Sequence, residues 1–290
     1  RACQNGRRGV AEMLVRSGNV DITYVDNFGR TPLHYIAKMG MVALAKFVLK
    51  EGVDVDYTDN AGQTALHFAA GNLQKEVFRL LLDHGADMEI ADDKGVLPIH
   101  LITNRGQHDM LTLMLNAGAN AHTMTNQGLS LLHVACFTRN RECVRILLEH
   151  GLDANATDKF GIAPIMDSVG NNQKEIVKIL LDAGADIGSR NIDGDETIHI
   201  ATIRGFKDML KLLLENGAKI DALNNFGLAP IHLAAYHGNK DIFKFLLDNG
   251  ADFEVKTGAG KSVIDIASEN GQKEIVELIG IIQMRRQAQG

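Results

Sequence analysis

The sequence predicts an all-α solenoid, in which short helix-turn-helix units stack side by side with a β-turn finger between successive units. Three observations support this fold class: glycine recurs every 33 residues, apolar residues within each period follow helical spacing, and helix start and stop signals recur in phase. The two glycine series are Gly29, Gly62, Gly95, Gly128, Gly161, Gly194, Gly227 and Gly260, and Gly52, Gly85, Gly118, Gly151, Gly184, Gly217 and Gly250.

A short first helix is predicted after each glycine of the first series, as in "GRTPLHYIAKMG" at residues 29–40. A Thr or Ser hydroxyl caps a helix N-terminus, and proline suits the first helical position because its missing N–H would be unpaired there. All four prolines occupy one position of the period, and six histidines share another: His34, His67, His100, His133, His199 and His232.

A second helix is predicted to end at each glycine of the second series, as in "LLDHGAD" and "LLENGAK". Its apolar residues are three and four positions apart, as for Ile176, Ile179 and Leu180. A glycine just past the last turn supplies the left-handed conformation that ends many helices, so we expect a positive φ at Gly151. The segment rich in Asp, Asn and Gly that follows is predicted to be an extended turn.

These residues resemble the ankyrin repeat, whose unit has 33 residues, two antiparallel helices, a β-turn finger and a T-P-L-H signature. "TPLH", "TALH" and "GAD" recur in phase over nearly the whole chain. We therefore expect residues 1–290 to form a single ankyrin repeat domain. It would comprise a partial repeat at 1–25, repeats at 26–58, 59–91, 92–124, 125–157, 158–190, 191–223 and 224–256, and a C-terminal capping repeat at 257–290.

The two ends of the sequence depart from the repeat. The chain begins inside a unit and without methionine, so we expect a piece of a longer protein. At the other end, Asp265 replaces the histidine, and no glycine of the second series follows, which is typical of a cap. Ile281 and Ile282 are apolar for a cap, and a partner could cover them.

Charge and composition argue against some kinds of partner and indicate a cellular compartment. The net charge of −6 argues against a nucleic-acid partner, although residues 1–50 carry eight Lys and Arg against three acidic residues. No apolar stretch is long enough for membrane insertion. The three cysteines form no framework and no signal peptide is present, so we expect an intracellular, cytoplasmic monomer, with the nucleus as the alternative location.

The sequence predicts no catalytic residue, no metal ligand and no cofactor. The periodic histidines are interpreted as structural, because a periodic residue needs a periodic explanation and the family implies hydrogen bonds to the neighbouring turn. Cys136 is expected to be a buried thiol, whereas Arg141 and Arg145 beside Cys143 leave open a reactive thiol there. "GAGKS" at 258–262 lacks the spacing of a phosphate-binding loop, and we expect no enzyme activity.

Two local departures from the repeat attract functional hypotheses. Met166 stands at the histidine position, and Asp167 follows it in a row of mostly apolar residues, so this site is either a drifted weak point or a partner contact. Asn155 occupies a position that resembles sites of asparaginyl hydroxylation in the family, with Leu147 eight residues earlier.

The function implied by the resemblance is a non-catalytic scaffold that binds a partner protein on a concave face of fingers and first helices. Apolar residues predicted on that face are Phe28, Val96, Leu129, Phe137, Phe160, Ile162, Ile203, Phe226, Leu228 and Tyr236, with the aliphatic ones alternatively buried between adjacent fingers. The basic residues of 1–50 are a second candidate contact. Two other classes stay open: a tether or assembly segment of a membrane channel, and the substrate-recruiting arm of an enzyme whose catalytic domain lies elsewhere.

Overall fold

The structure is a computed structural model of the chain, and it describes residues 9, 13, 17 and 21–287. Most of the predicted partial repeat 1–25, including Cys3, lies outside the described residues. The described part is helical, and its β-structure consists of isolated bridges such as Met124 with Ser130. The predicted class, an all-α solenoid of helix-turn-helix repeats, is confirmed.

The chain divides into two compact units, residues 1–152 and residues 153–290. The described helices of unit 1 are α2 (Pro32–Met39), α3 (Val42–Lys50), α4 (Ala65–Gly71), α5 (Lys75–Asp83), α6 (Pro98–Asn104), α7 (His108–Asn116), α8 (Leu131–Phe137) and α9 (Arg141–Glu149). Those of unit 2 are α10 (Pro164–Gly170), α11 (Lys174–Asp182), α12 (Thr197–Ile203), α13 (Lys207–Glu215), α14 (Pro230–Tyr236), α15 (Lys240–Asp248), α16 (Val263–Glu269) and α17 (Lys273–Gln287).

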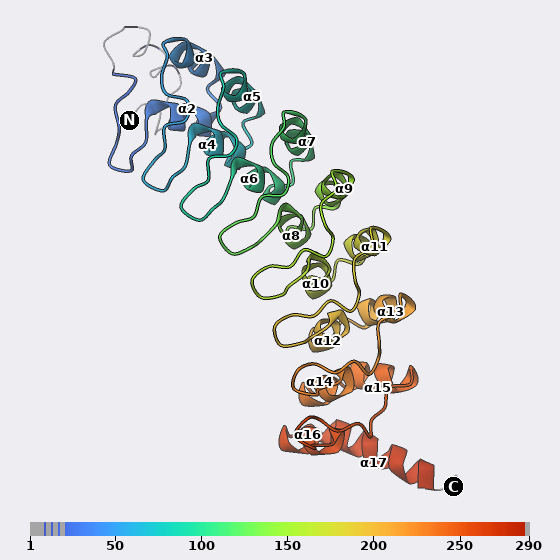
Figure 1. Cartoon of the computed structure of the whole chain (residues 1–290). Helices are drawn as coiled ribbons and strands as arrows, with labels where there is room; N and C mark the ends of the chain where they lie inside the picture. Colours follow the sequence, from blue (N-terminus) through green and yellow to red (C-terminus); the bar gives the residue numbers. More distant parts are fainter. Residues whose placement is uncertain (1–8, 10–12, 14–16, 18–20, 288–290) are drawn as a thin grey trace. The chain divides into compact units, whose positions relative to one another are not determined.

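Each predicted repeat from 26–58 onward contains one pair of these helices, and within each unit the pairs stack in chain order (Figure 1). In unit 2, α10 packs against its own second helix α11 and against α12, the first helix of the next repeat. The same arrangement recurs for α4 with α5 and α6 in unit 1. The first helices therefore form one row in each unit, the second helices form another, and the loops between repeats project beside the first row.

Helix starts follow the predicted chemistry. The Thr64 and Ser130 hydroxyls accept hydrogen bonds from the backbone N–H of His67 and His133 at the starts of α4 and α8. Proline occupies the first turn of α2, α6, α10 and α14, where a missing N–H removes no helical hydrogen bond. The short helices begin at the predicted places because both signals act locally.

Two kinds of left-handed residue end the helices. Gly151 after α9 has a φ of +79°, as predicted, and the other described glycines of its series are also positive. A further left-handed position lies between the two helices of each repeat, and three repeats fill it with a residue that has a side chain: Leu73, Arg139 and Asn172, at φ values of 60°, 62° and 56°. That second position was not predicted.

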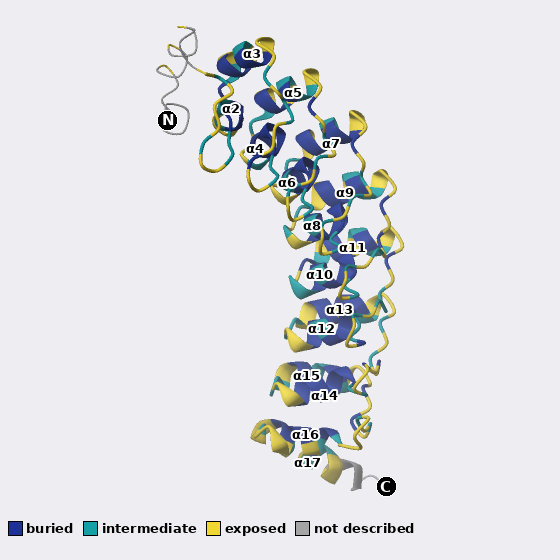
Figure 2. Cartoon of the chain, turned by 60° about the vertical axis from the view of Figure 1, so that its left-hand side comes forward, coloured by how far each residue is buried: buried dark blue, intermediate teal, exposed yellow. Residues whose placement is uncertain are grey.

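The core lies between the helices, as Figure 2 shows by its dark-blue faces. It is mainly aliphatic, although Phe78 and Phe243 in second helices are fully buried. Ala37, Ala70 and Ala235 in first helices have no exposed surface, because neighbouring helices of the row approach closely there. The small residues of the period therefore set the close packing of the stack.

The last repeat keeps only part of the hydrogen-bond pattern. The Asp265 carboxylate accepts hydrogen bonds from the backbone N–H and the hydroxyl of Ser262, at 2.9 and 2.6 Å. It therefore holds the start of α16, but it lacks the outward donor that a histidine would direct to another repeat. The longer helix α17 buries Ile275 and Ile279 and leaves Ile281 exposed.

Candidate functional site

The side chain of the first residue in each turn stabilises the tip of the finger. We use "finger tip" for residues 26–30 and the segments related to them by 33, such as 158–162, 191–195 and 224–228. The Asp158 carboxylate accepts hydrogen bonds from the backbone N–H groups of Phe160 and Ile162, at 2.8 and 2.9 Å. These bonds close the turn and hold Phe160 at its tip, where 58% of its surface is exposed.

Backbone hydrogen bonds join the finger tips of unit 2. The N–H of Ile192 donates to the carbonyl of Phe160 at 3.0 Å, and the N–H of Asn225 donates to the carbonyl of Asp193 at 3.0 Å. The N–H of Gly258 likewise donates to the carbonyl of Phe226 at 3.3 Å. These bonds hold the backbones of successive finger tips together, so Phe160, Ile192 and Phe226 project from turns that are joined to one another.

Several predicted side chains are exposed in unit 2. Phe226 is 61% exposed on its finger tip, and Tyr236 and Ile203, at the ends of α14 and α12, are 52% and 39% exposed. Phe28 and Phe137 of unit 1 are also exposed. The role of these residues in binding a partner stays a prediction.

The predicted aliphatic residues occupy a different environment. Val96, Leu129, Ile162 and Leu228 are half-buried, which agrees with the alternative that they pack between fingers. The carbonyl groups of Val96 and Leu228 also accept a hydrogen bond from a histidine of the preceding repeat. These four residues contribute less open apolar surface than the aromatic members.

Sequence reasoning missed Ile192, which is 63% exposed on its finger tip. Asparagine occupies this position in other repeats, where its amide donates to the preceding finger, as Asn225 does to the carbonyl of Ile192 at 3.0 Å. The sequence shows that Ile192 replaces an asparagine of the repeat, and this departure could have identified Ile192 as a candidate contact.

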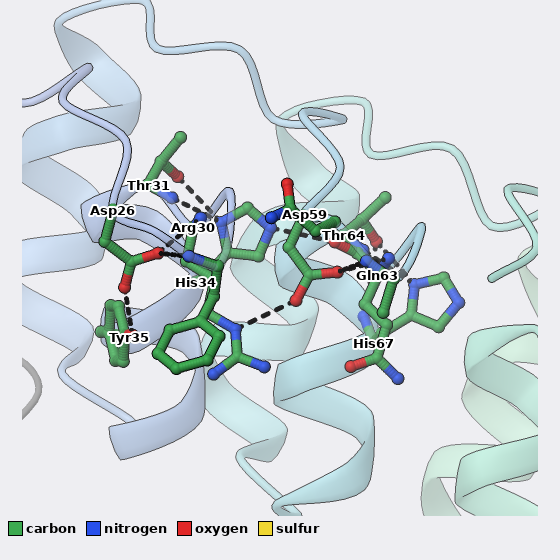
Figure 3. A network of polar contacts seen from close by, with 12 residues as sticks. Asp26, Arg30, Thr31, His34, Tyr35, Asp59, Gln63, Thr64 and His67 are labelled. Carbon is green, nitrogen blue, oxygen red and sulfur yellow. Dashed lines mark hydrogen bonds and ion pairs between the residues drawn. The ribbon is translucent and has the colours of Figure 1, made fainter. Parts of the chain in front are cut away.

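Periodic histidines connect neighbouring repeats, as Figure 3 shows for His34 and Gln63; the others with this contact are His67, His199 and His232. In His67, Nδ1 accepts a hydrogen bond from the backbone N–H of Thr64 at 3.1 Å, so the ring proton is on Nε2, which donates to the carbonyl of Val96 at 3.0 Å. His34 makes the same contacts with Thr31 and Gln63. Burial lowers the pKa of His67, as it does for His34 and His232, and it lowers that of His100 to about 4. The rings of His34, His67 and His232 are therefore neutral structural donors.

In unit 1, the side chain of Arg30 contacts a carboxylate and two aromatic rings of its own chain. The Arg30 Nε lies 3.0 Å from the Asp59 carboxylate, whose side chain is almost fully buried (Figure 3). The guanidinium carbon lies 5.3 Å from the ring centre of Phe28 and 4.9 Å from that of Phe68. Arg30 is therefore held by its own chain, which weakens the case for it as part of a second, basic contact.

The repeat at 158–190 differs from its neighbours at the same places. Met166 is buried at the histidine position and cannot donate to the next finger. The half-buried Asp167 follows it, and burial together with the negative charge of Asp158 raises the pKa of Asp167 to about 7. This position holds Ile200 and Leu233 in the next two repeats.

Asn155 is fixed by the following repeat. Its side-chain oxygen accepts a hydrogen bond from the N–H of Asp186 at 2.7 Å, and its amide donates to the carbonyl of Gly184 at 3.0 Å. An aspartate could replace only the accepting half of this pair. The side chain thus has a structural role, and its hydroxylation stays a prediction.

The two described cysteines lie in the core. Cys136 and Cys143 are fully buried, and burial raises the pKa of Cys143 to about 11, so the reactive-thiol alternative is wrong. Among the described residues, no three His, Cys, Asp or Glu side chains come together as metal ligands would. None of the helices in the described part of the chain combines the length and apolar character needed to cross a bilayer.

Comparison with known proteins places these features in a family. A family model for ankyrin repeats in sets of three copies matches residues 1–92, 99–191, 165–257 and 198–284. Comparison with curated proteins gives no match. Among solved structures, the chain is similar to the ankyrin repeat domain of Bcl-3, described as a unique member of the IkappaB protein family. The TM-score is 0.65 and the identity 29%, over 76% of this chain and 99% of that one.

Proposed function

Because this chain belongs to the ankyrin repeat family, we propose that it is a non-catalytic scaffold that holds another protein on a concave face of fingers and first helices. Ankyrin repeats generally mediate protein–protein interaction, and they are typically non-catalytic. The fold alone does not determine a binding site, so the proposal depends on particular side chains.

The observation that carries the proposal is the exposed apolar set in unit 2, which we call the unit 2 surface. It consists of Phe160, Ile192, Ile203, Phe226 and Tyr236. Exposed apolar patches mark interaction sites, and aromatic side chains are frequent energetic anchors of interfaces. The hydrogen bonds between finger tips order this surface in advance, which reduces the entropy lost on binding.

Peptides selected from a random display library against the whole chain provide the test. Selected peptides are then measured against a triple variant with Phe160→Ser, Phe226→Ser and Tyr236→Ser. We expect the triple variant to lose binding while its helical circular dichroism and melting temperature stay unchanged, because exposed side chains contribute little to stability.

A matched control changes three exposed apolar residues of unit 1 that are not among the predicted contacts: Met39→Ser, Leu73→Ser and Met124→Ser. This control should bind the selected peptides as the unchanged chain does. Peptides that bind the triple variant equally well, or a selection that enriches none dependent on the surface, would show that the unit 2 surface is not the binding site.

A further inference from the structure

Ion pairs between the second helices of neighbouring repeats follow one register. In three of the described repeats, a lysine at the first position of the second helix pairs with an acid 34 residues later, at the second position of the next second helix. These pairs, with N to O distances of 3.1, 3.0 and 2.9 Å, are Lys75–Asp109, Lys174–Asp208 and Lys240–Glu274. In each of them, a lysine side chain reaches from one second helix to the next.

Repeat 26–58 has no lysine at this position. Val42 is the first residue of α3, and the acid in the same register is Glu76, the second residue of α5. The helices α3 and α5 pack against each other in unit 1, and a pocket of about 280 Å³ is lined by both residues. Within the described part of the chain, the Glu76 carboxylate has no ion pair. This repeat therefore has the acid and the space for a lysine side chain, but not the lysine.

The pocket has the size and the lining for one long side chain. Pockets for drug-sized ligands begin at about 300 Å³, and this pocket is smaller. Val42 and Leu80 are half-buried and give it apolar surface, whereas Glu76 is exposed. A lysine side chain has the matching form, because its methylene stem packs on apolar surface while its ammonium group stays in water. A lysine that lies on Val42 and Leu80 therefore places its charge beside Glu76.

Two exposed cations of the chain, Lys46 and Arg79, also line the pocket, and the exposed Asp83 offsets one of these charges. The equivalent residues in α11 and α13 are Lys178 and Lys211. The bridge between α11 and α13 forms at 3.0 Å although both of these cations are present. Positive charge at the two positions is therefore compatible with a further ammonium group on the acid between them.

We propose that the pocket between α3 and α5 binds a lysine side chain of another protein. The occupant supplies from outside the lysine that bridged repeats carry at the position of Val42. Its stem lies on Val42 and Leu80, and its ammonium group pairs with the Glu76 carboxylate. An exposed ion pair is weak by itself, so residues that flank this lysine in the bound segment add contacts. The site goes beyond the proposed function, because it lies on second helices of unit 1 and uses no residue of the unit 2 surface.

The test uses the whole chain and a variant that fills the pocket from within. Val42→Lys restores the register of the other repeats, so its own lysine should pair with Glu76. A random peptide display library is selected on the unchanged chain and depleted on Val42→Lys, and we expect the remaining peptides to share a lysine. Replacing that lysine by norleucine, which keeps the stem and removes the charge, should weaken binding about threefold to fivefold, as should Glu76→Gln. The two changes together should cost no more than either alone, because they remove one interaction.

Ala43→Lys is the matched control, since it adds the same charge at the next residue, which is exposed. It should bind the peptides as the unchanged chain does, and melting temperatures show that each variant is folded. The inference would be overturned by a selection that leaves no peptide after depletion, by peptides without a lysine, or by additive losses in the double change. Equal losses in Ala43→Lys and Val42→Lys would also overturn it, because they would indicate repulsion by added charge. None of these outcomes affects the test of the unit 2 surface.

Discussion

The Nε2 atom of His67 lies 3.0 Å from the carbonyl oxygen of Val96, which belongs to the finger of the following repeat. At the same time, its Nδ1 atom accepts a hydrogen bond from the backbone N–H of Thr64. One neutral, buried ring therefore gives a hydrogen-bond partner to the backbone N–H at the start of its own helix and to a carbonyl of the next finger. His199 repeats the arrangement in unit 2, with Glu196 and Leu228 as its partners.

His67→Leu should lower the free energy of unfolding by about 2 kcal/mol or more, because it leaves a buried N–H and a carbonyl without partners. Urea unfolding followed by circular dichroism measures the loss. The reverse change, Met166→His, restores the ring at a position that lacks it and should be neutral or stabilising. A His67→Leu chain as stable as the original would show that the ring is a passive filler.

Acidification should weaken the fold through these histidines. Burial holds the pKa of His34, His67 and His232 below the unfolded value of about 6.5, and that of His100 at about 4. Below pH 6.5 the unfolded chain then binds more protons than the folded chain, so stability is full above that pH and declines toward pH 4. The urea midpoint should be lower at pH 5 than at pH 7.5, and equal midpoints would contradict the buried neutral rings.

Gly151→Val should destabilise the chain by more than about 1 kcal/mol, because a side chain at a φ of +79° is strained. A Cβ at this position would meet no atom within 4 Å, so the cost comes from the backbone alone. Gly151→Asn is the control, because asparagine tolerates the left-handed region better than valine. Thermal unfolding should rank the glycine first, asparagine second and valine last.

Asp167→Ile should stabilise the isolated chain at pH 8 by about 1 kcal/mol or more. The pKa of Asp167 is about 7 in the folded chain, above the ordinary aspartate value of 3.8. Between pH 3.8 and pH 7, the folded chain therefore keeps a proton on Asp167 that the unfolded chain has lost. Stability from this group is therefore present at low pH and declines as the pH rises through about 7. The difference in melting temperature between the variant and the original should be larger at pH 8 than at pH 5.

The repeat period predicted most of the fold because its signals act over a few residues. Thr64, Pro98 and Gly151 each fix a helix start or end locally, and the sequence shows all three. The left-handed turn at Leu73 and Arg139 was missed, because these residue types rarely adopt it. The signal that could have found it is the glycine at the same position of other repeats, as at Gly106 and Gly205.

The candidate surface was predictable only in part. The repeat pattern places Phe160 and Tyr236 outward, but the half-burial of Ile162 and Leu228 depends on how closely adjacent fingers pack. The raised pKa of Asp167 also required coordinates, because the burial that causes it depends on how α10 packs against its neighbours.

The hydrogen bonds between repeats have a consequence for how the chain folds. They join residues 29 apart for His67 and Val96, 31 apart for Asn155 and Asp186, and 36 apart for Gln272 and Tyr236. Such separations do not grow as repeats are added, so the entropy lost in closing each loop is the same for a short array and a long one. The relative contact order therefore falls with length, and folding can begin at any well-formed pair of repeats and spread in both directions.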